Sequence, residues 1–288
     1  MPDNEVEAHY SRGDLYRAIA DALVAAGKDI SHLEPDDLVP LEHFHGRGVA
    51  ATADLAASLA PSAEDELLDI GCGIGGPARY FARTFGCRVV GVDLTADFCD
   101  VARRLNQAVG LSENIQIEQA SATGLPFDDG RFDAAYSQNV SMNIADKAGF
   151  FEEAHRVLRP GGAFALSELA LGDGGPVIYP TPWSIDGVHS FLLTEQQTVA
   201  GLETAGFEVI SVQDNGPVMH RFLEAQREAV ARDGAPKLGP FILMGADAKE
   251  KGRNTARNLE EGRTRPIEIF CRRAQGLSGR GDDPLVRR

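Results

Sequence analysis

The stretch that decides the fold is Leu67-Leu68-Asp69-Ile70-Gly71-Cys72-Gly73-Ile74-Gly75-Gly76. A short apolar run typical of a buried strand leads into a glycine-rich turn, and helix-compatible sequence follows from Pro77. Glycines let a backbone turn tightly and approach a ligand without Cβ contacts, while the following helix presents its N-terminus. The stretch therefore predicts a strand, a ligand-binding turn and a helix, with a nucleotide-like cofactor at the turn.

Taken alone, this motif leaves two cofactors open. Gly71, Gly73 and Gly76 satisfy the dinucleotide pattern GxGxxG, and Asp93 follows Gly71 by 22 residues, where an acidic side chain would hold a ribose. NAD and S-adenosylmethionine both carry such a ribose, so the choice between them depends on the rest of the chain.

The pattern around the motif predicts the fold class. Short β-branched runs alternate mostly with helix-like stretches, which is typical of a doubly wound α/β fold with a mostly parallel sheet, here seven-stranded. The predicted strands are 66–70, 88–93, 115–118, 132–137, 163–169, 207–212 and 267–272. The predicted helices outside the βαβ units are 10–26, 48–59, 194–205, 217–231 and 247–261.

Three regions are predicted around this sheet. Residues 1–60 are expected to form a helical cap and residues 61–275 the cofactor-binding core, with a flexible tail at 276–288. The Gly/Pro-rich stretch that begins at Gly172 is expected to be an insertion after the fifth strand, here called the lid segment (residues 172–193).

Composition excludes several functional classes. The chain has 288 residues and a net charge of −15, and so acidic a surface repels a phosphate backbone, which argues against nucleic acid as a partner. No apolar run approaches the length of a membrane helix, and the first residues do not resemble a signal peptide. The four cysteines show no metal-binding spacing and are expected to be buried thiols. We therefore expect a cytoplasmic protein that acts on a small molecule and binds neither metal nor membrane; a homodimer stays possible.

Three ordered motifs make this sequence similar to the class I S-adenosylmethionine-dependent methyltransferases over roughly residues 40–215. The first motif is Leu68 to Gly75, which includes an acidic residue two positions before the first glycine. The second is Leu125-Pro126-Phe127 followed by Phe132-Asp133, and the third is Arg156-Val157-Leu158-Arg159-Pro160-Gly161-Gly162. The resemblance favours S-adenosylmethionine over NAD as cofactor.

The resemblance also implies cofactor contacts. Gly71, Cys72 and Gly73 would lie under the methionine part, while Asp93 would accept hydrogen bonds from the ribose hydroxyls and Leu94 would pack on the adenine. Ser121 and Ala122 stand where the family commonly has an acidic residue for the adenine amine. Ser121 can hydrogen-bond but carries no charge, and Ala122 would act through its backbone.

The residues that follow the predicted fourth strand are expected to lie beside the transferred methyl group, because open α/β sheets bind ligands at the carboxyl ends of their strands. Gln138 is the predicted nearest residue and Asn143 a substrate contact. This passage and residues 41–52 look most like the sarcosine/dimethylglycine N-methyltransferase branch. Arg47 in the second passage could pair with a carboxylate of cofactor or substrate, and an ordinary solvated arginine stays open.

The acceptor is expected to meet the cap and the lid segment. The lid segment contains Tyr179, Trp183 and His189 but no lysine or arginine, which favours an amine over a phosphorylated acceptor. The proton of the amine could pass to water or to Glu168, His189 or Tyr10. An O- or C-methyltransferase of a natural-product or quinone pathway stays open, as does a non-catalytic cofactor-binding protein. The sequence does not fix the acceptor, the number of methyl groups transferred or the oligomeric state.

Overall fold

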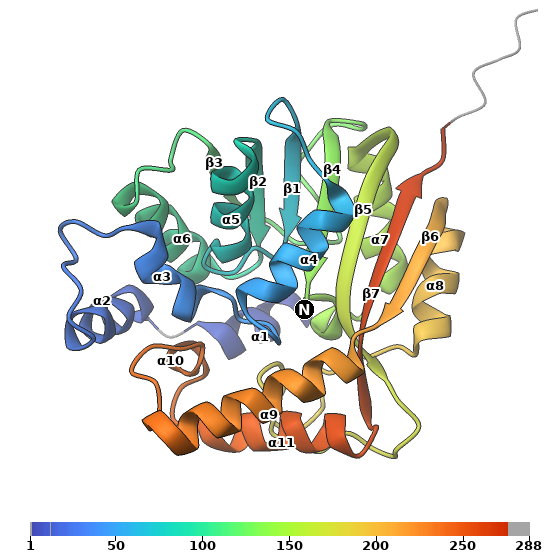
Figure 1. Ribbon diagram of the computed structural model, residues 1–288. Coiled ribbons are helices and arrows are strands. Elements are labelled where there is room, and N and C mark those ends of the chain that lie inside the picture. Colours follow the sequence, from blue (N-terminus) through green and yellow to red (C-terminus); the bar gives the residue numbers. More distant parts are fainter. Residues whose placement is uncertain (1, 12, 276–288) are drawn as a thin grey trace, which may run out of the picture.

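The computed structural model describes residues 2–11 and 13–275, so the predicted flexible tail lies outside the described residues. Its centre is a seven-stranded sheet in the order β3-β2-β1-β4-β5-β7-β6, in which β7 runs antiparallel to both neighbours (Figure 1). The strands are β1 (Glu66–Ile70), β2 (Arg88–Asp93), β3 (Ile115–Gln119), β4 (Phe132–Gln138), β5 (Leu158–Leu171), β6 (Phe207–Asp214) and β7 (Thr264–Arg273). The predicted doubly wound, mostly parallel fold is confirmed.

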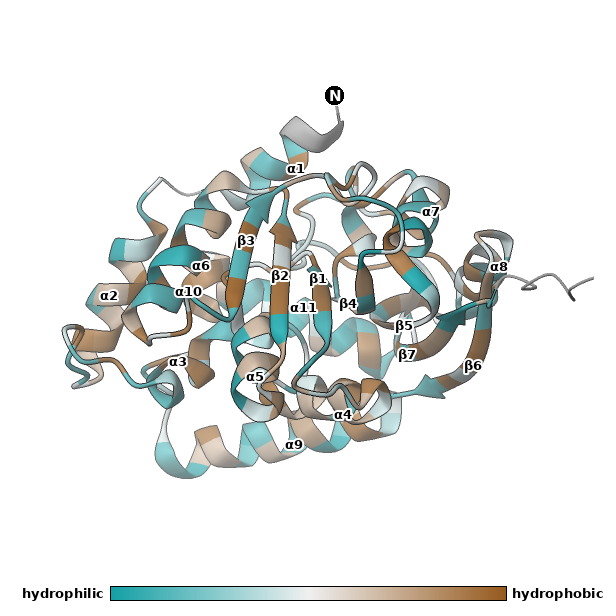
Figure 2. Ribbon diagram, turned by 90° about the horizontal axis from the view of Figure 1, so that it is seen from above, coloured by the Kyte–Doolittle hydropathy of each residue, from teal (hydrophilic) through white to brown (hydrophobic). Residues whose placement is uncertain are grey.

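Helices cover the sheet on both faces. The helices are α1 (Pro2–Tyr10), α2 (Leu15–Ala25), α3 (Pro35–Glu42), α4 (Val49–Leu59), α5 (Gly76–Phe85), α6 (Ala96–Ala108), α7 (Lys147–Val157), α8 (Glu195–Thr204), α9 (Gly216–Asp233), α10 (Phe241–Met244) and α11 (Ala248–Glu260), with a 3₁₀ turn at Ser141–Asn143. Phe150 and Phe151 of α7 pack on one face of the sheet, and Phe81 of α5 packs on the other, against Tyr136. Successive strand residues point to opposite faces, and the central strands β1 and β2, covered on both, are largely brown in Figure 2, whereas β3 is partly teal.

The strand order reverses beside β1, and this places the site. β1 pairs with β2 on one side and with β4 on the other, so the chain winds outward in both directions from it. The loops after these three strands therefore meet at one edge of the sheet, where doubly wound folds bind their ligands.

Three separate segments of the chain cover this edge. The first four helices are joined by the lid segment and by the insertion between β6 and β7, which contributes α9, α10 and α11 (Figure 1). Leu243 of α10 is buried in the same apolar cluster as Leu15 and Ile19 of α2 and Phe98 of α6. The helical cover is therefore built from both ends of the sequence.

The structure corrects several predicted boundaries. The predicted helix 10–26 corresponds to α2, which begins only at Leu15, after Gly13 with its positive φ of 64°, and the separate helix α1 was not predicted. The helix at Pro35–Glu42 was not predicted, and β5 is longer than predicted at both ends. Among the described residues, no helix combines the length and apolar character required to cross a bilayer.

Candidate active site

The glycine turn after β1 is shaped by close backbone approach. Gly71 has φ of 82°, and a Cβ built on it would lie 2.2 Å from Val140, so only glycine fits here. The amide nitrogens of Gly71 and Cys72 both donate to the carbonyl of Val92, at 2.8 and 2.9 Å. The turn is thus held against the end of β2, and the Cys72 and Ile74 carbonyls are bonded within the chain, to the Gly75 amide and to Arg79.

Asp93 ends β2 and holds two loops together. Its Oδ2 accepts a hydrogen bond from the Gly73 amide at 2.8 Å, and its Oδ1 accepts one from the Thr95 amide at 2.9 Å. Burial raises the pKa of this carboxyl, and the amides of Thr95 and Gly73 oppose that change. The carboxylate is fixed in place at the wall of a cavity.

This cavity, with a volume of about 310 Å³, lies over the carboxyl ends of β1, β2 and β4. Such a volume suits a nucleoside-sized ligand. Nine of the residues predicted from the sequence line it: Tyr10, Gly71, Gly73, Asp93, Leu94, Ser121, Ala122, Gln138 and Asn143. The structure therefore brings together residues from four loops and from α1.

Asp69 lines the same cavity from the end of β1. Burial raises its pKa to about 8, while the neighbouring Tyr136 hydroxyl lowers it. Its Oδ2 makes no hydrogen bond within normal limits among the described residues, so this carboxyl can serve Tyr136 or an ammonium or hydroxyl group of a ligand.

Two predicted residues lie beside the cavity without lining it. The side chain of Cys72 is buried against Gly91, so only its backbone belongs to the glycine turn. Arg47 is buried and pairs with Asp54 at 2.6 Å. Its guanidinium is therefore already matched by a carboxylate of the chain.

Glu168 supports the wall of the cavity from behind. The side chain is buried, and its Oε1 accepts a hydrogen bond from the Ser141 amide at 3.0 Å. Burial raises its pKa, while the nearby Lys147 lowers it. These contacts fix the loop after β4 and keep Glu168 out of the cavity lining.

Trp183 and His189 line a second cavity, between α1 and the lid segment. Asn143 borders both cavities, which makes them neighbours. Trp183 is 3% exposed, and its Nε1 donates to Ser190 Oγ at 2.9 Å. Tyr179 lies in neither lining; its ring packs on Gly187.

Asn143 ties α1 to the lid segment. Its Oδ1 accepts from the Tyr10 hydroxyl at 2.9 Å, and its Nδ2 donates to the carbonyls of Trp183 and His189, at 2.8 and 2.9 Å. His189 also lies 3.3 Å from Glu5 of α1. The first helix is thereby fixed as a roof over the cofactor cavity and shields it from water.

Sequence reasoning missed several wall residues, among them Phe44 and His45. They lie within residues 41–52, whose resemblance to the sarcosine/dimethylglycine branch was noted, but no pattern singled out these side chains. His45 Nε2 lies 3.2 Å from Thr52 Oγ1, which in turn lies 3.2 Å from Gln138 Oε1. Only the three-dimensional contact between α4 and β4 reveals this link.

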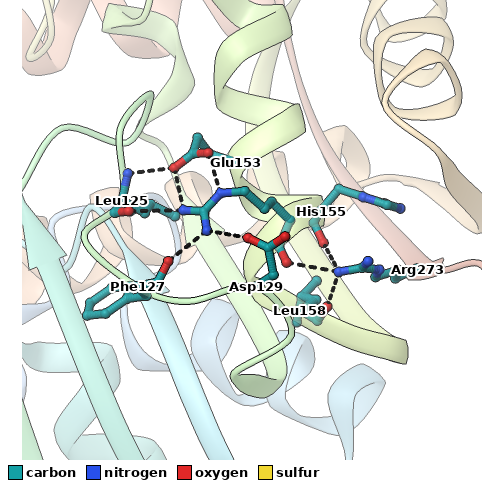
Figure 3. Close-up of polar contacts among 8 residues, drawn as sticks. Leu125, Phe127, Asp129, Glu153, His155, Leu158 and Arg273 are labelled. Carbon is teal, nitrogen blue, oxygen red and sulfur yellow. Dashed lines mark hydrogen bonds and ion pairs between the residues drawn. The ribbon is translucent and has the colours of Figure 1, made fainter.

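Two of the sequence motifs meet away from the cavity, around Arg156 of α7. Its guanidinium donates to the carbonyls of Leu125 and Phe127 and pairs with Glu153, whose carboxylate accepts from the Leu125 amide (Figure 3). Arg273 of β7 donates to three carbonyls at the end of the same helix (Figure 3). These motifs hold the loop that carries Ser121 and Ala122 in place.

The residues fit S-adenosylmethionine. A fixed carboxylate stands at the wall for ribose hydroxyls, Leu94 and Ala122 offer apolar surface for a base, and the Asp69 carboxyl suits the ammonium of an amino acid.

Comparison with known proteins agrees with this geometry. Residues 68–166 match the methyltransferase domain family. The chain is 32% identical over 218 residues to a sarcosine/dimethylglycine N-methyltransferase of Halorhodospira halochloris, covering 74% of this chain and 76% of the relative. It is 29% identical to phosphoethanolamine N-methyltransferase 3 of Arabidopsis thaliana, covering 67% of this chain but 39% of that protein.

Solved structures support the fold. The geranyl diphosphate C-methyltransferase of Streptomyces coelicolor A3(2) superposes with a TM-score of 0.64 at 20% identity, covering 79% of this chain and 78% of that one. Together, the extended match to the Halorhodospira relative and the site geometry show that the chain belongs to the class I S-adenosylmethionine-dependent methyltransferases.

Proposed function

We propose that the protein transfers a methyl group from S-adenosylmethionine to a small amine. The observation that carries the proposal is the cavity in which the glycine turn, Asp93 and Gln138 meet under α1. The extended similarity to an enzyme named for sarcosine and dimethylglycine supports an amine as acceptor.

Each cofactor contact is assigned to a named group. We assign the ribose hydroxyls to Asp93 and the adenine to Leu94 and Ala122, with Ser121 within reach of its polar edge. The methionine end is assigned to Asp69 and to the turn formed by Gly71, Cys72 and Gly73. These assignments follow from which side chains line the cavity and which polar groups lack partners.

The chemistry requires alignment more than a strong base. Bound S-adenosylmethionine supplies a methyl group on a positively charged sulfur, which an amine lone pair can displace in line. The protein contributes by holding the amine and by keeping water out, through α1 and the lid segment. Of the proposed proton acceptors, Tyr10 borders the cofactor cavity and His189 the second cavity, whereas Glu168 borders neither. Tyr10 and His189 therefore remain the proposed proton acceptors besides water.

The acceptor is assigned to the space between α1 and the lid segment. The second cavity carries the indole of Trp183 together with the carboxylates of Glu5 and Asp186, a combination that favours a positively charged ligand. Arg47 is paired with Asp54, and Tyr179 supports the lid from outside the cavity lining.

We also propose a cytoplasmic protein whose partner is this small molecule rather than nucleic acid. The buried free thiols of Cys72, Cys87, Cys99 and Cys271 suit a reducing compartment, and the net charge of −15 disfavours nucleic acid.

A methyl-transfer assay tests the proposal. Purified protein, labelled S-adenosylmethionine and a panel of amines and phenols should give methylated amines and S-adenosylhomocysteine. Turnover of phenols alone would replace the amine by a hydroxyl acceptor. Tight S-adenosylhomocysteine binding without turnover of any acceptor in the panel would instead favour a non-catalytic binding protein.

A further inference from the structure

Thr52 of α4 is the centre of a buried polar cluster beside the cofactor cavity. The side chain is fully buried, and its Oγ1 lies 3.1 Å from His43 Nδ1, 3.2 Å from His45 Nε2 and 3.2 Å from Gln138 Oε1. We call these four residues the Thr52 cluster. His45 and Gln138 also line the cavity, so the cluster reaches the place where the ligand binds.

The number of available protons limits how this cluster can be arranged. A threonine hydroxyl donates one hydrogen bond and accepts two. Burial lowers the pKa of His43 to about 3 and of His45 to about 4, so at neutral pH each imidazole carries a single N–H. Of the three groups around Thr52, at most one can accept and the other two must donate.

With the Gln138 oxygen facing Thr52, three groups are poorly matched. The Gln138 nitrogen, in a side chain only 8% exposed, has no partner among the described residues. Both imidazoles must then donate to Thr52, which turns the bare Nδ1 of His45 toward the Gly46 carbonyl at 3.4 Å. It also turns the bare Nε2 of His43 toward Glu42 Oε1 at 3.8 Å.

A half-turn of the Gln138 carboxamide gives the Gln138 nitrogen a partner and relieves one of the two imidazoles. Its nitrogen then donates to Thr52, and the Thr52 hydroxyl is free to donate to one imidazole. Either His45 can then donate to the Gly46 carbonyl or His43 can turn its N–H toward Glu42. In both cases the amide oxygen of Gln138 becomes the acceptor left without a partner in the described chain.

We propose that Thr52 and His45, with His43, are positioning residues that fix the Gln138 carboxamide with its oxygen free for the ligand. An amide oxygen accepts hydrogen bonds and cannot donate them. The inference rests on the proposed amine function for its consequence: the acceptor is a primary or secondary amine, whose N–H is held by this oxygen while its lone pair remains free. A tertiary amine offers no N–H in its neutral, reactive form.

Neutron diffraction on crystals of the full chain grown in deuterated buffer tests the orientation directly. Deuterium should appear on the Gln138 atom that faces Thr52. Deuterium on the opposite atom would overturn the proposal, whatever the acceptor turns out to be.

Kinetics of hydroxyl variants test the role of the cluster. Thr52→Val should lower kcat/KM by roughly tenfold, as expected for one lost hydrogen bond, with S-adenosylhomocysteine affinity unchanged by calorimetry. Thr52→Ser should restore most of the activity. In a Gln138→Ala background, Thr52→Val should cause no further loss. An equal loss in both backgrounds would show that Thr52 acts independently of Gln138.

Thr198→Val is the matched control. Thr198 is another buried threonine, but its hydroxyl donates to the Thr194 carbonyl in α8, far from the cavity in the fold. The variant should leave kcat/KM unchanged; a loss equal to that of Thr52→Val would make the Thr52 effect nonspecific and overturn the role.

An amine series tests the consequence for the acceptor. Methylation should proceed from a primary to a tertiary amine and stop there, so glycine and sarcosine should be methylated and dimethylglycine should not. Tertiary amines reacting as fast as secondary amines would contradict the inference. If phenols alone react, the proposed amine function fails, while the neutron result still decides the Gln138 orientation.

Discussion

At the scale of single residues, Asp93 has a structural role beside the ribose contact proposed for it. It receives the amides of Gly73 and Thr95, so its carboxylate is already ordered before a ribose arrives. Pre-ordered groups lose less entropy on binding, which makes their contribution to affinity larger.

Replacing Asp93 by alanine should weaken S-adenosylhomocysteine binding by roughly 2 to 4 kcal/mol, because it removes a charged acceptor that serves two hydroxyls. Calorimetry checks this. Asp100→Ala, an exposed carboxylate on the neighbouring helix α6, is the control and should bind normally. A loss below about 0.5 kcal/mol in Asp93→Ala would remove Asp93 from the ribose contact.

His43 predicts a pH effect on stability. Burial lowers its pKa to about 3 in the folded protein, whereas the unfolded chain has an ordinary imidazole near 6.5. As the pH falls, the unfolded state therefore binds the proton first. The contribution of His43 to stability is fully present above pH 6.5 and is lost progressively as the pH falls from 6.5 toward about 3.

Thermal unfolding between pH 7.5 and 5 should show a loss of stability in wild type that is weaker in His43→Phe, which does not titrate at this position. The difference should approach about 1.4 kcal/mol per pH unit in the acid half of this range. Parallel pH profiles for the two proteins would contradict the shifted pKa.

Some residues were predictable from sequence and others were not. Gly71 and Asp93 stand in a local pattern whose geometry is fixed by a strand, a turn and a helix. Phe44 and His45 reach the same cavity from a separate segment, and only tertiary packing places them there. Glu168 was expected near the methyl transfer because it lies in the fifth strand, but its carboxylate accepts a hydrogen bond from the Ser141 amide in the loop after β4.

At the scale of elements, the strands of the βαβ units were predicted closely because β-branched runs between helices leave little ambiguity. The apolar positions of the predicted helix 10–26 run from Leu15 to Ala26 and so mark α2 alone, whereas α1 was missed. The short helix α3 was missed because Pro40 lies within it. α3 instead has a capping box, in which Glu34 and Asp37 each accept from the other's backbone, and this local chemistry offsets the proline.

Asn143 bridges α1 and the lid segment, beside the direct contacts of His189 with Glu5 and of His9 with the Pro182 carbonyl. Asn143→Ala should loosen both elements, because it removes the Tyr10 bond and the two bonds to lid carbonyls. Hydrogen exchange measured by mass spectrometry should show faster exchange in residues 2–11 and 180–191, with weaker S-adenosylhomocysteine binding.

Asn254→Ala is the matched control for this clamp. Asn254 of α11 donates to the Pro180 carbonyl at 3.0 Å, so it holds the lid segment without contacting α1. Its loss should speed exchange in the lid segment alone. Unchanged exchange of residues 2–11 in Asn143→Ala would show that α1 is held by other contacts.

At the scale of the whole molecule, the helical cover and the core share one buried ion pair. Arg79 of α5 is 1% exposed and donates from Nε to Glu42 Oε2 of α3 at 2.8 Å. It also donates to Asn106 of α6 and to the Ile74 carbonyl in the glycine turn. One guanidinium thus joins the cover, two core helices and the cofactor-binding turn.

Removing only one partner of this pair should be strongly destabilising. Arg79→Met leaves Glu42 buried and unpaired, which should cost about 3 to 5 kcal/mol, and the double variant Glu42→Leu/Arg79→Met should recover part of the loss. Burial already raises the pKa of Glu42 against the opposing effect of Arg79. Without Arg79 the carboxyl must take up a proton to fold, so the unfolded state loses its proton first as the pH rises. The destabilisation of Arg79→Met should therefore grow from pH 5 to pH 8.

Arg83→Met separates this effect from the general loss of a contact between α3 and α5. Arg83 pairs with Asp36 across the same two helices at 2.9 Å, but their side chains are 38% and 82% exposed. Exposed pairs contribute about 1 kcal/mol or less, so this variant should unfold almost like wild type at every pH. Urea unfolding followed by circular dichroism, with and without S-adenosylhomocysteine, gives both free energies. Equal destabilisation in the Arg79 and Arg83 variants, or no pH dependence in Arg79→Met, would mean that the cover is held on by packing and that the buried charge does not couple it to the cofactor turn.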